Sequence, residues 1–151
     1  GEVYRIDLKR IDGKKRSVIY LVDADEGMIC ITSPEYVSRL AIQAGQAIRV
    51  QGPVHYHTRW QEDVLRIQEI EKISSNPDWQ KCQERKIDEI LAHTAVDLPA
   101  AMAELISTEK AFCAVRNYYA DACIPCRQPF LIMLVESIVQ RAINYGITTR
   151  T

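Results

Sequence analysis

The sequence lacks a large excess of charge of either sign and any long uninterrupted apolar run. Nineteen Lys and Arg residues stand against twenty Asp and Glu residues, which gives a formal net charge of −1. A histone-like polycation is therefore excluded, and any binding of nucleic acid must depend on a local basic patch. The longest apolar run, Phe130–Val135, is far shorter than the roughly 20 residues that cross a bilayer, so no membrane contact is expected.

Common catalytic signatures are also missing. The chain contains no glycine-rich phosphate loop, no nucleophile elbow and no His-Glu-x-x-His motif, and no acid and base recur at a defined spacing. We therefore expect a protein that is not an enzyme. Its 151 residues, 47% hydrophobic and 26% charged, have the composition of a folded globular protein. Because the chain begins at Gly1 and not at Met, we expect that an N-terminal targeting segment would lie outside it.

The chain has five cysteines, an odd number at irregular spacing, which argues against a secreted disulfide framework. A reducing intracellular location, the cytoplasm or the nucleus, is therefore expected. The pair Cys123 and Cys126, in Cys-Ile-Pro-Cys, leaves three alternatives open. The two residues are free thiols at a helix–helix turn; or they bind a structural zinc with Cys113, the set being completed by Cys82 or His93; or they form a redox pair with a low-pKa Cys123.

Two halves with different patterns make up the chain. Residues 1–75 show the alternation and turn residues of β-strands, and residues 76–151 show helical spacing. The border is the polar segment Ser74–Trp79, which contains Pro77. We therefore predict an α+β protein with a β-domain at 1–75 and a helical domain, for interaction or oligomerisation, at 76–151.

The first half predicts five strands and one helix. In the first strand, Tyr4, Ile6 and Leu8 are expected to face the same side, and Asp12–Lys15 predicts a hairpin turn with Gly13 at its second position. The predicted strands and the helix are, in chain order, Val3–Ile11, Ser17–Ala24, Met28–Thr32, the helix Ser33–Gly45, Gln46–Val54 and Val64–Ile73.

One segment resembles a known family. Residues 44–73, AGQAIRVQGPVHYHTRWQEDVLRIQEIEKI, are similar to the fourth and fifth strands of nucleic-acid-binding OB-fold domains of the anticodon-binding and replication protein A type. The resemblance covers about residues 3–73 and implies a five-stranded OB-fold β-barrel with a helix between its third and fourth strands. It also implies a ligand groove flanked by the loop between strands one and two and the loop between strands four and five. Since OB barrels also bind sugars and proteins, the ligand is left open.

Of the loops that the resemblance points to, the first is rich in cations, and the second combines an arginine with aromatic and imidazole rings. Such a set is what single-strand binding requires, because cations attract phosphates and aromatic faces stack unpaired bases. Ordinary solvated lysines and a Trp60 folded back on the barrel are the alternative. On strand two, Tyr20 either stacks a base or belongs to the core. The candidate nucleic-acid-binding residues are Arg10, Lys14, Lys15, Arg16, Tyr20, His55, Tyr56, His57, Arg59 and Trp60.

The second half predicts four helices, the last of them apolar all round in its first turns. That helix either fills the centre of a bundle or is covered by a second copy or a partner protein. The predicted helices are Pro77–Thr94, Leu98–Ser107 capped by Asp97, Glu109–Asp121 capped by Thr108, and Pro129–Gly146.

The sequence thus predicts a single-stranded nucleic-acid-binding protein, with DNA as the favoured ligand, that acts in replication, repair, recombination or DNA transfer. Under this hypothesis Trp60→Ala should weaken binding with little loss of stability. An OB-fold scaffold for protein–protein interaction is the alternative. It is favoured by the balance of 11 basic and 11 acidic residues in residues 1–76.

Overall fold

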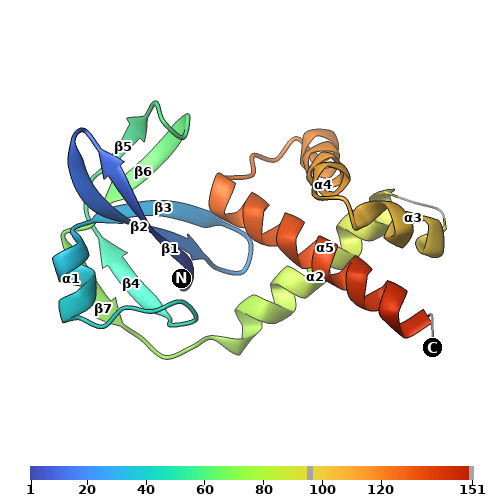
Figure 1. Ribbon diagram of the computed structural model, residues 1–151, viewed down its shortest axis with the longest axis horizontal. Helices are drawn as coiled ribbons and strands as arrows, with labels where there is room; N and C mark the ends of the chain where they lie inside the picture. Colours follow the sequence, from blue (N-terminus) through green and yellow to red (C-terminus); the bar gives the residue numbers. More distant parts are fainter. Residues whose placement is uncertain (95–96, 150–151) are drawn as a thin grey trace.

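A computed structural model describes residues 1–94 and 97–149; Ala95, Val96, Arg150 and Thr151 lie outside the described residues. The chain is a mixed α/β structure with strands in the first half and helices in the second (Figure 1). This confirms the predicted order of β-structure followed by helices. Whether the halves are separate domains stays a prediction.

Within the described residues, seven strands form two sheets. The larger sheet has the order β1-β2-β3-β6-β5, and β4 pairs with β7 in the smaller one. Neighbouring strands are antiparallel except β3 and β6, which are parallel. The strand bounds are β1 Glu2–Ile11, β2 Lys14–Val22, β3 Gly27–Thr32, β4 Ile48–Gln51, β5 Val54–His57, β6 Glu62–Arg66 and β7 Glu69–Lys72.

The last two of the five predicted strands are each interrupted once, and β5 extends into the predicted loop between them. Gly52 and Pro53 separate β4 from β5, and a Cβ on Gly52 would lie 1.8 Å from the Arg66 carbonyl oxygen. The pairing nevertheless continues across the breaks, because Arg66 N donates to Pro53 O at 2.9 Å and Gln68 N donates to Gln51 O at 2.8 Å. The two broken segments therefore act as two bent strands.

The N-terminus links the two sheets. Val3 N donates to Gln46 O at 2.8 Å, and Ile48 N donates to Gly1 O at 2.9 Å. The connectivity, with helix α1 (Pro34–Arg39) between the third strand and the first bent strand, is like that of an OB fold. The sheet is not closed along its full length, because β5 pairs with β6 alone among the described strands.

A bulge in β1 overturns one predicted alternation. The register shifts between Val3 and Arg5, which turns Tyr4 toward the outer apolar clusters while Ile6 packs in the interior. A β-bulge inserts one residue and so reverses the facing of all residues before it. Leu8, expected to be buried with Tyr4 and Ile6, is 69% exposed.

Of two local predictions in the first half, the turn is confirmed and the length of the helix is wrong. The Asp12–Gly13 turn is confirmed, since both residues have positive φ, 52° and 79°, as a two-residue hairpin turn requires. Ser33 caps α1 and accepts a hydrogen bond from Tyr36 N at 3.2 Å. The helix ends at Arg39, however, well before Gly45, because Ala41 takes a left-handed conformation.

Four helices follow the strands, close to their predicted positions. Helix α4 begins one residue early, because Ser107 and not Thr108 is its cap and accepts from Lys110 N at 3.4 Å. Asp97 precedes α3 without a side-chain capping bond, and Gly146 lies inside α5. The bounds are α2 Pro77–Thr94, α3 Leu98–Leu105, α4 Thr108–Ala122 and α5 Gln128–Thr149.

Helix α5 joins the helical core to the sheet (Figure 1). Phe130, Leu134 and Ile138 are at most 1% exposed and pack in one cluster with Val22 of β2. At Gly27 of β3 an added Cβ would lie 2.8 Å from Phe130 N, so this glycine allows the close approach of the helix. The interpretation of α5 as a central bundle helix therefore holds for its first turns.

Among the described residues, α5 is the one helix whose length and composition would allow it to cross a membrane. A core helix passes the same test, and the buried residues of α5 pack inside the protein. The sequence analysis predicted this helix but not its membrane-crossing length and composition, because Glu136 and Arg141 interrupt the apolar run. The absence of membrane contact stays a prediction.

Candidate nucleic-acid interface

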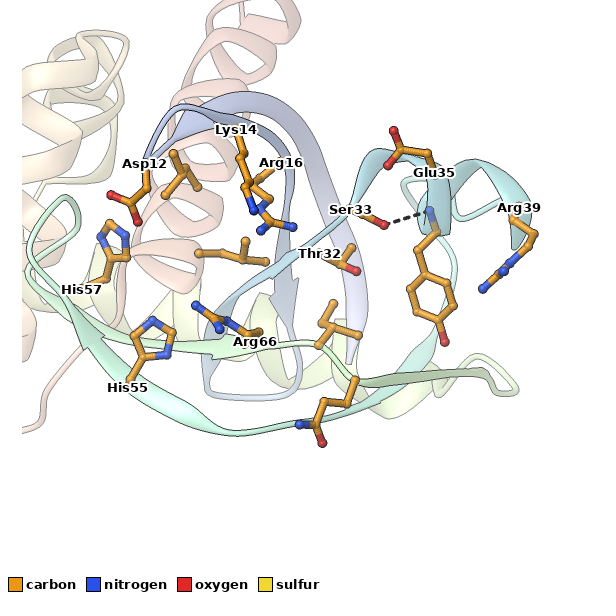
Figure 2. A pocket seen from close by; sticks show the side chains of 15 residues that line it. Asp12, Lys14, Arg16, Thr32, Ser33, Glu35, Arg39, His55, His57 and Arg66 are labelled. Carbon is orange, nitrogen blue, oxygen red and sulfur yellow. Dashed lines mark hydrogen bonds between the residues drawn. The ribbon is translucent and has the colours of Figure 1, made fainter.

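A groove of about 620 Å³ lies between the β1–β2 hairpin and the β5–β6 hairpin (Figure 2). Its floor contains Ile11 and Ile31, which belong to the apolar cluster on the outer face of the larger sheet. The predicted pair of loops therefore does flank a common groove. The full lining is Ile11, Asp12, Lys14, Arg16, Ile31, Thr32, Ser33, Glu35, Tyr36, Arg39, His55, His57, Arg66, Ile67 and Gln68.

Three cations of the lining come from two strands. Figure 2 shows Lys14 and Arg16 of β2 opposite Arg66, the last residue of β6. None of the three forms an ion pair or a side-chain hydrogen bond with a described residue. Unpaired cations gathered in a concave site raise the local concentration of anions. The lining as a whole holds four Lys and Arg residues against Asp12 and Glu35.

The two hairpins touch at their tips. Arg59 Nη1 donates to Arg10 O at 3.0 Å, and Arg10 Nη1 donates to Gly13 O at 3.3 Å. The Arg59 side chain thus joins the two hairpins, whereas the Arg10 side chain bonds within its own hairpin. Both arginines were expected in the ligand site, and neither lines the groove. His57 Nδ1 accepts from Arg59 N at 3.1 Å, which fixes the orientation of that imidazole.

His55 and His57 line the groove together, and their ring centroids lie 6.3 Å apart. This is the shared face expected for residues two apart on a strand. Tyr56 lies between them on β5, points to the opposite face and is 60% exposed. Lys15 does not line the groove either, because it alternates with Lys14 and Arg16 on β2. The structure therefore does not bring Tyr56 and Lys15 to the other candidates.

Two of the three expected Trp and Tyr stacking rings are buried. Trp60 is 6% exposed and Tyr20 is 3% exposed, and both pack with Val18, Ile29 and Val64 on the outer face of the sheet. Their faces are therefore not available to a base in this structure, which is the alternative that the sequence left open. Tyr20 shares one face of β2 with Val18 and Val22 by alternation, and the packing of that face buries its ring.

The N-terminus of α5 covers the outer side of the β5–β6 hairpin. Gln128 Nε2 donates to Trp60 O at 2.5 Å, and Gln128 N donates to both carboxylate oxygens of Glu62, at 3.1 and 3.3 Å. Burial raises the pKa of Glu62 above its ordinary value, and the hydrogen bond from Gln128 N opposes that shift. Trp60 is thus held from the helical side as well as from the sheet.

Sequence reasoning missed Arg66, Arg39 and Thr32 as groove residues. Arg66 reaches the groove because β6 pairs in parallel with β3, where Arg66 faces Ile31. Parallel partners far apart in the sequence carry no local signal of their register. Arg39 enters the lining because α1 ends there. Thr32 is 7% exposed, and its hydroxyl hydrogen-bonds to no described residue.

The cysteines do not form a metal site among the described residues, where no three His, Cys, Asp or Glu side chains gather to hold an ion. The expected zinc ligands Cys113, Cys123 and Cys126 are free thiols, the first two exposed and the third half-buried. The structure therefore does not bring the expected ligands together, and a zinc site stays a prediction. Burial raises the pKa of Cys126 to about 11, so this thiol is protonated at neutral pH.

No family model matches this chain, and no curated protein matches it. Solved structures with weak overall similarity include a Stn1–Ten1 complex from S. pombe, at 15% identity, 59% of this chain, 65% of that chain and a TM-score of 0.41. The yeast Stn1 and Ten1 structure is 16% identical and matches 59% of this chain and 48% of that chain, with a TM-score of 0.40. Asparaginyl-tRNA synthetase from Pyrococcus horikoshii is 15% identical and matches 81% of this chain and 31% of that chain, with a TM-score of 0.38. This chain spans less than two thirds of each of these chains.

Proposed function

We propose that this chain is an OB-fold protein that binds single-stranded nucleic acid, DNA in the first instance, in the groove between its two hairpins. It acts inside the cell in replication, repair, recombination or DNA transfer, and it is not an enzyme. The observation that carries the proposal is the groove itself. It combines the unpaired cations Lys14, Arg16 and Arg66 with two imidazoles on the outer face of an OB-like sheet.

The roles of the groove residues follow from their positions. The cations neutralise phosphates, and bases stack on the exposed ring of His55 and beside His57, since histidine is among the side chains that stack unpaired bases. Trp60 and Tyr20 form the apolar support beneath. Stacking is thus assigned to different rings from those that the sequence favoured.

Binding to single strands should depend steeply on salt. With Lys14, Arg16, Arg39 and Arg66 each neutralising one phosphate, counterion release predicts a loss of affinity of about fifty-fold between 50 and 200 mM salt. The measurement is fluorescence anisotropy of single- and double-stranded oligonucleotides titrated in parallel at both concentrations. An affinity that is independent of salt, or equal for both strand forms, would contradict the proposal.

A scaffold for protein partners is the second candidate function, and one observation favours it. Strand β5 lies at the edge of the larger sheet and exposes Val54 (49%) and Tyr56 (60%). An exposed edge can accept a further strand from a peptide. This candidate predicts no oligonucleotide binding even at low salt, so the same titration separates the two functions.

The helical half supplies a contact for a second copy or a protein partner under either candidate function. Its exposed large apolar side chains include Leu98, Ile106, Ile143 and Ile147, at 49%, 45%, 37% and 61%. Sedimentation equilibrium of the wild-type chain and of Ile147→Ser tests self-association. A dimer that dissociates in the variant is expected if α5 forms the interface, whereas a wild-type monomer assigns this surface to another partner.

A further inference from the structure

We infer that the groove receives the phosphorylated end of a nucleic-acid strand, and not an internal stretch that passes through it. The inference deepens the proposed function and depends on it. It starts from the uneven distribution of charge, because Lys14, Arg16 and Arg66 gather at one place in the groove while Asp12 and Glu35 lie toward its two ends (Figure 2).

A strand that runs through the groove would carry one phosphodiester after another past both carboxylates. Each internal phosphodiester has one negative charge. A terminal phosphate carries between 1.5 and 2 negative charges at neutral pH and has three acceptor oxygens, as in a phosphoserine side chain. Three unpaired cations beside the Thr32 hydroxyl therefore match a terminal phosphate better than an internal one.

One end of the groove is obstructed by the protein itself. At that end Asp12 and His57, from the two hairpins, approach one another (Figure 2), and the tips are joined by the hydrogen bond from Arg59 to Arg10 O. Behind them Trp60 is buried and its carbonyl oxygen is bound by Gln128 of α5. A strand that enters between α1 and β6 therefore meets a closed end and must stop there.

The experiment compares oligonucleotides of one sequence that carry an internal fluorophore. Their ends bear a 5′-phosphate, a 3′-phosphate or hydroxyls only, and a fourth form is circular. One of the phosphorylated linear forms is expected to bind about tenfold or more tightly than the hydroxyl form, and the circle is expected to bind no better than the hydroxyl form. Equal binding of all four would overturn the inference and leave the proposed function standing. Binding of none would overturn both.

Single substitutions, each measured with the phosphorylated and the hydroxyl oligonucleotide, test whether the groove cations cause the preference for a phosphorylated end. In Arg66→Gln the preference for the phosphorylated end should fall to near unity, and Arg16→Gln should reproduce the result if the first variant is unstable. Arg85→Gln, on the exposed face of α2, is the matched control and should keep the full preference. A preference that survives both groove substitutions contradicts the assignment.

Competition distinguishes a strand end from a small phosphorylated molecule. Inorganic phosphate and a nucleoside monophosphate should displace the phosphorylated oligonucleotide only at concentrations far above its own, because the first has no base and the second lacks the further bases and phosphates of the strand. If either competitor is as potent as the oligonucleotide, the ligand is the small molecule and the strand-end inference is wrong.

Discussion

Gly52→Ala should destabilise the chain by at least about 3 kcal/mol, because the new methyl group would meet backbone and not a movable side chain. An ideal Cβ at this position lies 1.8 Å from the Arg66 carbonyl oxygen and 2.9 Å from its carbonyl carbon. Relief requires the two bent strands to separate at the point where β4 passes into β5. For a chain of this length, thermal unfolding followed by circular dichroism should show a loss in Tm of about 10 °C.

The matched control is the same substitution at Gly146. An alanine Cβ there meets no atom within 4 Å, and the residue lies inside α5. Alanine favours a helix over glycine by up to about 1 kcal/mol, so Gly146→Ala should raise the Tm slightly. If the Tm of Gly52→Ala were no lower than that of the wild type, the bent-strand pairing described for the sheet would be wrong.

Trp60→Ala should cost about 3–5 kcal/mol of folding free energy, the usual range for emptying a core of a large aromatic ring. The indole is 6% exposed and packs against Val64 and the His57 ring, whose centroid lies 4.8 Å away. This reverses the expectation from the sequence, in which the substitution weakened binding alone. Urea unfolding monitored by circular dichroism measures the loss, since the indole itself is absent from the variant.

Tyr56→Ala is the control from the same hairpin. Its ring is 60% exposed on the face of β5 away from the groove, and exposed substitutions of this kind usually change stability by no more than about 0.5 kcal/mol. Oligonucleotide affinity should also stay within about twofold, because the ring does not line the groove. A Trp60→Ala protein as stable as wild type, or a Tyr56→Ala protein that no longer binds, would contradict the placement of these two rings.

Local signals in the sequence were sufficient for most of the elements. The Asp12–Gly13 turn follows from two residues that tolerate positive φ, and α2 follows from Pro77 at its start and the stripe containing Ile87 and Leu91. The shared face of His55 and His57 follows from the two-residue period of a strand. Each of these depends on residues close together in the chain.

The choice among groove residues could not be made from local signals. Trp60 and Tyr56 both looked like stacking residues in one exposed turn, and only the packing of the hairpin against the sheet and Gln128 separates the buried ring from the exposed one. Alternation within the apolar strand β2 left the facing of Tyr20 open until its neighbours were placed. The shift at the bulge near Tyr4 likewise has no local marker.

The sequence by itself determined the order of strands and helices, the basic first hairpin, the aromatic second hairpin and the absence of known catalytic motifs, because these depend on short-range periodicity and residue type. Tertiary structure alone decided that Arg66 joins Lys14 and Arg16, that Arg59 ties the hairpins together and that α5 supports Trp60. The reason is that each of these contacts joins segments distant in the sequence, through a parallel strand register or through helix-on-sheet packing. Neither leaves a periodic trace in the residues that take part.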